Sequence, residues 1–338
     1  MDRNSLHRLV LGTVTAGTLM MGVAGQAHAD AYAYSLLDIS NFTLFNVSQG
    51  RQVDTTDFTS FNTTTTLAAE ASSNFMGSAS SPATQFGLGI AADIPQACVG
   101  ACPADNTFAQ GGLGQFSRGD ATASGAAVTV NNGPASSVTA TTVAETRVIQ
   151  GGPAPVGNNA SAIGRVDPVI TTFTFTVADA SAVRIDFTAT LEMLVSLDAN
   201  ALSPFSNATA NSTFTITIDD DQGNQVFSWE PNGAATNTET GVSGEVDPFD
   251  LNTQRSNSIP GATFFAPGAA GLTQSGAFSV TTPVLAAGTQ YSARLTHRTQ
   301  TEVARVPEPA TLALFGVALL GLGVLLYRRR EESDGSAA

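Results

Sequence analysis

The chain has 338 residues and a formal net charge of −14, from 28 acidic and 14 basic side chains, and every basic one is arginine. A surface this acidic repels nucleic acid and acidic polysaccharide, which argues against any protein that binds a phosphate backbone. Only 12% of the residues are charged, and Thr, Ser, Ala and Gly are abundant, a composition typical of an extracellular β protein.

The first 29 residues have the layout of a secretory signal peptide. A basic start precedes a mostly apolar stretch over residues 9–24, and an A-x-A cleavage site follows at Ala27 and Ala29. We therefore predict that residues 1–29 are removed on export. The exported domain would begin at Asp30 and extend over residues 30–305, facing outward.

In the first half of this domain the strand signals are weak. Short strands are expected over residues 32–39, 42–47 and 138–149. Residues 64–125 are rich in Ala, Ser and Gly and have little periodicity, so we predict a loop-rich region there. A second loop is expected over residues 151–165 for the same reason.

The second half shows a clear alternation with a period of two residues. From Val183 to Leu197 apolar side chains fall on one face of an extended chain and polar ones on the other. Segments 169–177, 213–218, 278–284 and 291–295 repeat this pattern. Strands buried on one face are typical of antiparallel sheets, and two such sheets packed together form a β-sandwich. The predicted fold is therefore an all-β, antiparallel β-sandwich ectodomain.

Cys98 and Cys102 are the two cysteines of the chain. A disulfide between them is expected in an exported protein. A metal pair is the first alternative, but His297 is the one histidine that follows Asp30, so further ligands are lacking. A redox motif is the second, but such motifs favour two intervening residues, and here there are three.

Asp219, Asp220 and Asp221 form the sharpest polar feature of the domain, between two strand signals. One interpretation is a hairpin turn in which Gly223 and Asn224 supply positive φ. The other is a calcium site, since Ca²⁺ takes carboxylate oxygens. Adjacent side chains on a strand point to opposite faces, and the spacing of known calcium loops is absent, so the turn is favoured.

Catalytic machinery is hard to assemble from these residues. A Ser-His-Asp triad would have to use His297, which shares a strand face with Tyr291 and Leu295, and a lone histidine there is more often packed than catalytic. The single tryptophan, Trp229, is expected to pack in the core or at an edge rather than to stack on a sugar. We predict a protein that is not an enzyme and has no cofactor. A carboxylate pair of the glycosidase type remains open.

The last 33 residues contain three blocks. Val306-Pro307-Glu308-Pro309 is followed by an uncharged apolar run over residues 310–327 and then by Arg328, Arg329 and Arg330. The run predicts a transmembrane helix of roughly 27 Å, enough to cross most of a bilayer. The arginines would stop transfer and leave residues 331–338 as a cytoplasmic tail.

These three blocks resemble the PEP-CTERM sorting signal of Gram-negative bacteria in order and spacing, over residues 306–330. The same segment also carries the label of an ice-binding protein C-terminal domain, which implies nothing about ice for this chain. The resemblance implies an exosortase-dependent surface protein, processed near the Pro-Glu-Pro triplet by an exosortase, a membrane-embedded cysteine transpeptidase. One departure is the tail of eight residues beyond the arginines, where the family usually ends sooner.

Two functions follow from these observations. The first is a non-catalytic protein of the cell surface, the extracellular matrix or a biofilm. It would be exported by the secretion machinery, held in the inner membrane as an intermediate and then sorted to the surface or released, with exopolysaccharide as a possible partner and no nucleic acid. The second is a carbohydrate-binding or carbohydrate-cleaving β-sandwich on the same anchor. A face that gathers exposed aromatic side chains and paired carboxylates would distinguish the second from the first.

Overall fold

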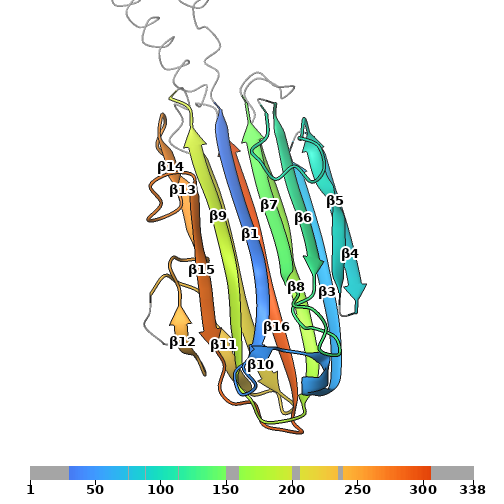
Figure 1. Ribbon diagram of the computed structural model, residues 1–338. Helices are drawn as coiled ribbons and strands as arrows, with labels where there is room; N and C mark the ends of the chain where they lie inside the picture. The colour runs from blue at the N-terminus through green and yellow to red at the C-terminus, as the bar shows by residue number, and fades with distance from the viewer. Residues whose placement is uncertain are drawn as a thin grey trace, which may run out of the picture.

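The computed structural model of the chain describes residues 30–74, 76–87, 89–112, 114–149, 160–199, 206–234 and 239–305. These residues form two antiparallel sheets that face each other (Figure 1). Within the described ranges the one helical element is a short 3₁₀ turn, Thr55–Asp57. None of the described helices is long and apolar enough to span a membrane. The predicted span over residues 310–327 lies outside the described residues.

The first sheet has nine strands, in the order β12-β15-β9-β1-β7-β6-β5, with β14 beside β9 and β2 beside β1. Its strands are β1 (Ala31–Asn46), β2 (Arg51–Gln52), β5 (Ile90–Gly100), β6 (Phe116–Gly125), β7 (Val138–Val148), β9 (Val183–Leu197), β12 (Ser243–Val246), β14 (Thr263–Phe265) and β15 (Thr273–Thr281).

The second sheet has seven strands, in the order β11-β10-β16-β8-β3-β4, with β13 beside β10. Its strands are β3 (Phe58–Ser73), β4 (Gly77–Phe86), β8 (Ala160–Val177), β10 (Asn207–Asp220), β11 (Gln225–Trp229), β13 (Gln254–Asn257) and β16 (Gln290–Arg305). The predicted all-β class and antiparallel sheets are confirmed.

Strand β1 joins two segments that the sequence predicts as separate strands. It runs unbroken from Ala31 to Asn46, and its register with both neighbours shifts between Ile39 and Thr43. Asn41 lies in this irregular stretch with a φ of 55°, a conformation that asparagine tolerates better than most residues. A bulge therefore explains why the sequence predicts two short strands where the structure has one.

Aromatic rings fill one part of the space between the sheets. Phe187 of β9 is central to this cluster, and four rings lie around it, on β1, β10, β11 and β15, with centroid distances of 6.0, 4.9, 5.7 and 5.1 Å to Phe42, Phe214, Trp229 and Phe278. A buried aromatic side chain removes much apolar surface from water, so this part of the interior is hydrophobic in the usual sense.

In another part of the interior the two backbones come into contact. A Cβ added at Gly119 of β6 would collide with the carbonyl groups of Arg165 and Glu70 on the facing sheet. A Cβ added at Gly164 of β8 would collide with the carbonyl of Arg118. Polar groups also meet across this gap, since the Ser117 hydroxyl donates to the Ile163 carbonyl at 2.6 Å.

The prediction that residues 64–125 are loop-rich is wrong. Most of these residues belong to β3, β4, β5 and β6. Small side chains on the inner face leave room for the sheets to approach closely, and the same small side chains weaken the contrast between faces on which a strand prediction depends. The loop predicted over residues 151–165 is also too long, because β8 begins at Ala160.

Candidate functional site: the strapped face of the nine-stranded sheet

Several residues singled out in the sequence lie outside the described part of the chain. They are the signal cleavage residues Ala27 and Ala29, the sorting motif Val306, Pro307, Glu308 and Pro309, and the stop-transfer residues Arg328, Arg329 and Arg330. Strand β16 ends at Arg305, the residue directly before Val306.

The acidic triplet forms a hairpin between β10 and β11. The Asp220 carboxylate accepts hydrogen bonds from the main-chain N–H groups of Gln222 and Asn224, at 3.0 and 2.8 Å. Bonds from Asn224 lower the pKa of Asp220. Gly223 has a φ of 79°, as the turn interpretation requires, but Asn224 does not share it. Among the described residues no group of three or more His, Cys, Asp or Glu is arranged to hold a metal ion.

His297 and Trp229 both lie between the sheets. The His297 side chain is buried, and neither ring nitrogen has a hydrogen-bond partner. Burial disfavours the charged imidazolium and lowers the pKa of His297 to about 4. The Trp229 ring is buried as well, and its Nε1–H donates to Glu245 at 2.7 Å. Neither side chain is presented to a substrate.

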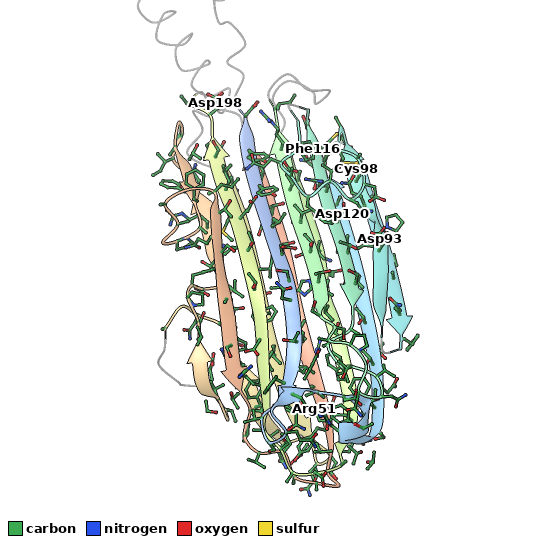
Figure 2. The ribbon with its side chains drawn as sticks, viewed as in Figure 1. Arg51, Asp93, Cys98, Phe116, Asp120 and Asp198 are labelled. Carbon is green, nitrogen blue, oxygen red and sulfur yellow. A yellow bond between two sulfur atoms is a disulfide. The ribbon has the colours of Figure 1, made fainter. Side chains whose placement is uncertain are left out.

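The outer face of the nine-stranded sheet is covered at one end by the connection between β5 and β6 (Figure 2). We call residues 101–112 and 114–115 of this connection the strap. Phe108 of the strap packs on an apolar cluster formed by Tyr34, Leu36 and Val143, all of which point away from the facing sheet and are buried nevertheless. The Tyr34 hydroxyl donates to the Phe108 carbonyl at 2.7 Å.

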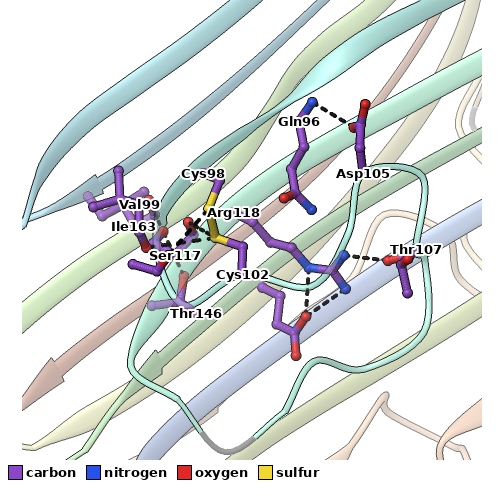
Figure 3. Close-up of a disulfide and its surroundings, with 12 residues drawn as sticks. Gln96, Cys98, Val99, Cys102, Asp105, Thr107, Ser117, Arg118, Thr146 and Ile163 are labelled. Carbon is purple, nitrogen blue, oxygen red and sulfur yellow. Dashed lines mark hydrogen bonds and ion pairs between the residues drawn. A yellow bond between two sulfur atoms is a disulfide. The ribbon is translucent and has the colours of Figure 1, made fainter.

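A buried ion pair between Arg118 of β6 and Glu145 of β7 holds the strap (Figure 3). Both side chains are 0% exposed, and Arg118 Nη2 lies 2.7 Å from Glu145 Oε2. The guanidinium also donates to two strap carbonyls, those of Thr107 and Ala109. Two buried charges are tolerated here because they are paired and their remaining hydrogen-bonding groups have partners.

The second oxygen of Glu145 serves the other end of the strap. Glu145 Oε1 accepts from the Tyr32 hydroxyl at 2.5 Å and from the main-chain N–H of Gly111 at 2.7 Å. Burial and the neighbouring Glu145 carboxylate both raise the pKa of Tyr32, so its hydroxyl stays protonated as a donor. One carboxylate therefore links β6, β1 and the strap.

A disulfide between Cys98 and Cys102 closes the base of the strap (Figure 3). Cys98 lies in β5 and Cys102 in the first residues of the strap. Gly100 between them has a φ of 94°, which permits the chain to reverse there. The bridge thus fixes the point at which the strap leaves the sheet.

Asp120 lies beneath the strap, two residues beyond Arg118 on the same strand. Its side chain is 0% exposed, and one oxygen accepts the main-chain N–H of Asn106 at 3.0 Å. Burial raises the pKa of Asp120 to about 6, with a further contribution from the Asp105 carboxylate. Asn106 also donates from its side chain to Asp93 of β5, at 3.0 Å. This part of the strap therefore rests on carboxylates rather than on apolar contacts.

A polar groove of about 380 Å³ lies beside the strap. Its floor includes Tyr32 of β1 and Arg147 of β7, and Ser196 of β9 and Thr263 of β14 form the opposite side. For comparison, the apolar gap within the aromatic interior is about 40 Å³. A small molecule could therefore bind in this groove.

Sequence reasoning missed the strap, the ion pair and the groove. One signal was available, since Arg118 and Asp120 in β6, and Glu145 and Arg147 in β7, are spaced by two and so share a face. Ionisable side chains repeated on one face of a strand normally indicate a solvated surface. The strap overturns that expectation here, because it buries the face.

The described residues define an all-β protein made of two antiparallel sheets, with a strapped outer face. A family model, the PEP-CTERM protein-sorting motif, matches residues 305–330. The chain is a PEP-CTERM sorting domain-containing protein, and the motif implies export and exosortase-dependent sorting toward the cell surface. Comparisons with curated proteins and with solved structures found no match.

Proposed function

We propose that this chain is a non-catalytic surface or matrix protein, exported by its signal peptide and delivered through its C-terminal motif. The match of the sorting motif to residues 305–330 carries the proposal. In this proposal the signal peptide is removed after Ala29, and the apolar run over residues 310–327 holds the intermediate in the inner membrane. An exosortase then acts near the Pro-Glu-Pro triplet.

The junction between the sandwich and the motif supports a tether held close to the membrane. Strand β16 pairs with β8 through Arg305 and with β10 through Ala304, so the sheet reaches the first matched residue. Four residues, 306–309, then precede the predicted span. At no more than about 3.6 Å per residue they cover roughly 14 Å. The sandwich would stand directly on the membrane rather than on a long stalk.

A tether at the C-terminus would pull on β16, a strand that is paired with a neighbour along both edges. The ladder of β16 with β10 runs from Asn207 to Asp220, and its ladder with β8 runs from Ala160 to Thr176. A force along β16 therefore loads two rows of inter-strand hydrogen bonds together. This arrangement suits a domain that must stay folded while the membrane holds its C-terminal end.

A non-catalytic role is supported by the state of the ionisable groups that the strap covers. Arg118 and Glu145 are occupied by each other, by Tyr32 and by strap main-chain groups. A general acid or base must reach the proton that it transfers, and these side chains are enclosed. Their arrangement fits a structural role.

The test is to replace Glu308 by alanine and follow the protein in a host that contains an exosortase. Glu308 would remain at the water side of the membrane, because burying its charge in lipid is costly. Glu308→Ala should leave export and membrane insertion intact and stop release of the domain, measured by cell fractionation and immunoblotting. Glu302→Ala, on the exposed face of β16, is the matched control and should be processed normally. Unchanged release and size of Glu308→Ala would mean that the tail is a plain anchor.

A further inference from the structure

A single row of cross-strand neighbours crosses the groove beside the strap, from its floor to its opposite side. Arg147 of β7 lies opposite Tyr32 of β1, Tyr32 lies opposite Ser196 of β9, and Ser196 lies opposite Thr263 of β14. Neighbouring strands are about 4.8 Å apart, so the row presents a polar group at each step over roughly 14 Å. Its regular spacing suits an extended ligand made of similar units.

Contacts with neighbouring groups hold the two floor side chains, Tyr32 and Arg147, in place. The Tyr32 hydroxyl is bonded to Glu145, and the Arg147 guanidinium lies 5.8 Å from the centre of the Tyr32 ring. Arg147 also pairs with Asp30 at 2.7 Å and donates to the Gly112 carbonyl at 3.2 Å. Side chains that are already fixed lose little conformational entropy when a ligand arrives. The floor is therefore organised before binding.

The opposite side of the groove offers hydroxyl groups. Ser196 Oγ and Thr263 Oγ1 lie 2.9 Å apart at the surface and share one hydrogen bond. Each hydroxyl has one donor and two acceptor positions, so the pair retains a donor and several acceptors for a ligand. Gln110 of the strap and Leu194 of β9 complete the lining with an amide and an apolar surface. This mixture suits a ligand that carries hydroxyl groups around an aliphatic ring.

The charges in and around the groove favour a neutral ligand over an anionic one. Asp30 and Asp198 line it together with Arg147, and the Asp198 main-chain N–H donates to the Asp30 carbonyl at 2.8 Å. Removal of the signal peptide after Ala29 would add the α-amino group of Asp30, which is largely protonated at neutral pH. The groove then contains two carboxylates and two cations, within a chain of net charge −14. The site itself becomes neutral, and its surroundings repel anions.

We infer that this groove binds a neutral oligosaccharide, with the Tyr32 ring and Leu194 against the aliphatic faces of the sugar rings. The Ser196–Thr263 pair and Gln110 would exchange hydrogen bonds with the sugar hydroxyls. The groove would bind the sugar without cleaving it, and the pair with Arg147 gives the Asp30 carboxylate a structural role. The inference is independent of the sorting step, because the residues that line the groove belong to the domain itself.

The experiment uses the exported chain, with Asp30 as its first residue, purified from membranes in detergent. A glycan array with neutral, acidic and amine-bearing oligosaccharides identifies the ligand class, and titration calorimetry with the best neutral glycan measures the Kd. The double variant Ser196→Ala/Thr263→Val should raise the Kd roughly tenfold, because it removes two hydroxyl hydrogen bonds. A chain extended by a few residues before Asp30 should also bind more weakly, because the α-amino group is displaced.

A matched control lies on the same face. Thr190 of β9 and Ser275 of β15 form an equivalent exposed hydroxyl pair, with a 3.1 Å hydrogen bond. Thr190 precedes Ser196 by six residues on β9. Thr190→Val/Ser275→Ala should leave the Kd unchanged. Absence of any neutral ligand, binding of acidic glycans alone, or equal effects of the two double variants would each overturn the inference. Cleavage of the bound glycan would overturn its non-catalytic part.

Discussion

Around Phe187 the two sheets are held apart by aromatic rings, whereas around Gly119 their backbones touch. The first region buries large apolar side chains and gains stability from their removal from water. In the second, Gly119 and Gly164 face the backbone of the opposite sheet with no room for a Cβ, and so little apolar area is buried between them. The same sandwich therefore uses two different interiors.

The thin region is the one that carries the strap. Strand β6 points Gly119 toward the facing sheet and its neighbour Arg118 toward the strap. Phe108 and Tyr34 then form a second apolar layer on the outer side. We conclude that a region where the sheets converge can be stabilised from outside, by a covering loop that turns an outer face into an interior one.

The largest effect should come from adding a side chain where the backbones touch. Gly119→Val places its Cβ and two methyl groups against the carbonyls of Arg165 and Glu70, and neither carbonyl can move without breaking its ladder. We expect a loss of more than about 4 kcal/mol in the free energy of unfolding, or no folded protein. Denaturant titration followed by circular dichroism measures it.

The control for this variant is Ala189→Val on the inner face of β9, in the aromatic region. Ala189 is fully buried, so ordinary overpacking should cost about 1–3 kcal/mol. Equal losses at the two positions would show that the regions do not differ in how closely the sheets approach.

The next effect concerns the pair that holds the strap. Arg118→Leu leaves the Glu145 charge buried without its partner and should cost about 3–5 kcal/mol. The double variant Arg118→Leu/Glu145→Leu should cost clearly less than the sum of the two single variants, because no lone charge remains. Chemical denaturation of all three variants gives the coupling energy.

An exposed pair on the same sheet is the control for that cycle. Arg184 and Asp186 are bonded at 2.8 Å with side chains 42% and 33% exposed. Arg184→Leu should cost less than about 1 kcal/mol, as for most surface ion pairs. A coupling between Arg118 and Glu145 no larger than this would contradict the role given to the strap.

The smallest effect is a pH dependence that arises between the sheets. The pKa of His297 is about 4 in the folded chain and 6.5 in an ordinary environment, so folding favours the neutral ring. The stability that depends on the neutral ring is fully present above pH 6.5 and is lost as the pH falls from 6.5 to about 4. The loss is about 3 kcal/mol.

His297→Leu isolates this contribution, because the difference between wild type and variant should change by that amount between pH 7 and pH 4. The comparison is needed because Asp120, with its raised pKa, works in the opposite direction over the same range. Equal pH profiles of wild type and His297→Leu would show that a hydrogen-bond partner stabilises the protonated His297 ring in the folded protein.

Much of this protein follows from local sequence alone. The alternation over residues 183–197 predicts β9 and its buried face, because apolar and polar side chains differ sharply there. The hairpin at Asp220 follows from turn chemistry that involves a few adjacent residues. The sorting motif at the C-terminus is equally local, and a family model finds it at residues 305–330.

The tertiary structure alone decided where the sheets converge and what covers them. In β4 and β6 both faces carry mostly small or polar side chains, and so periodicity could not separate inside from outside there. The groove depends on Arg147, Tyr32, Ser196 and Thr263, which are far apart in sequence and become neighbours only through strand pairing. Register between distant strands is set by the packing of whole sheets, and no local pattern encodes it.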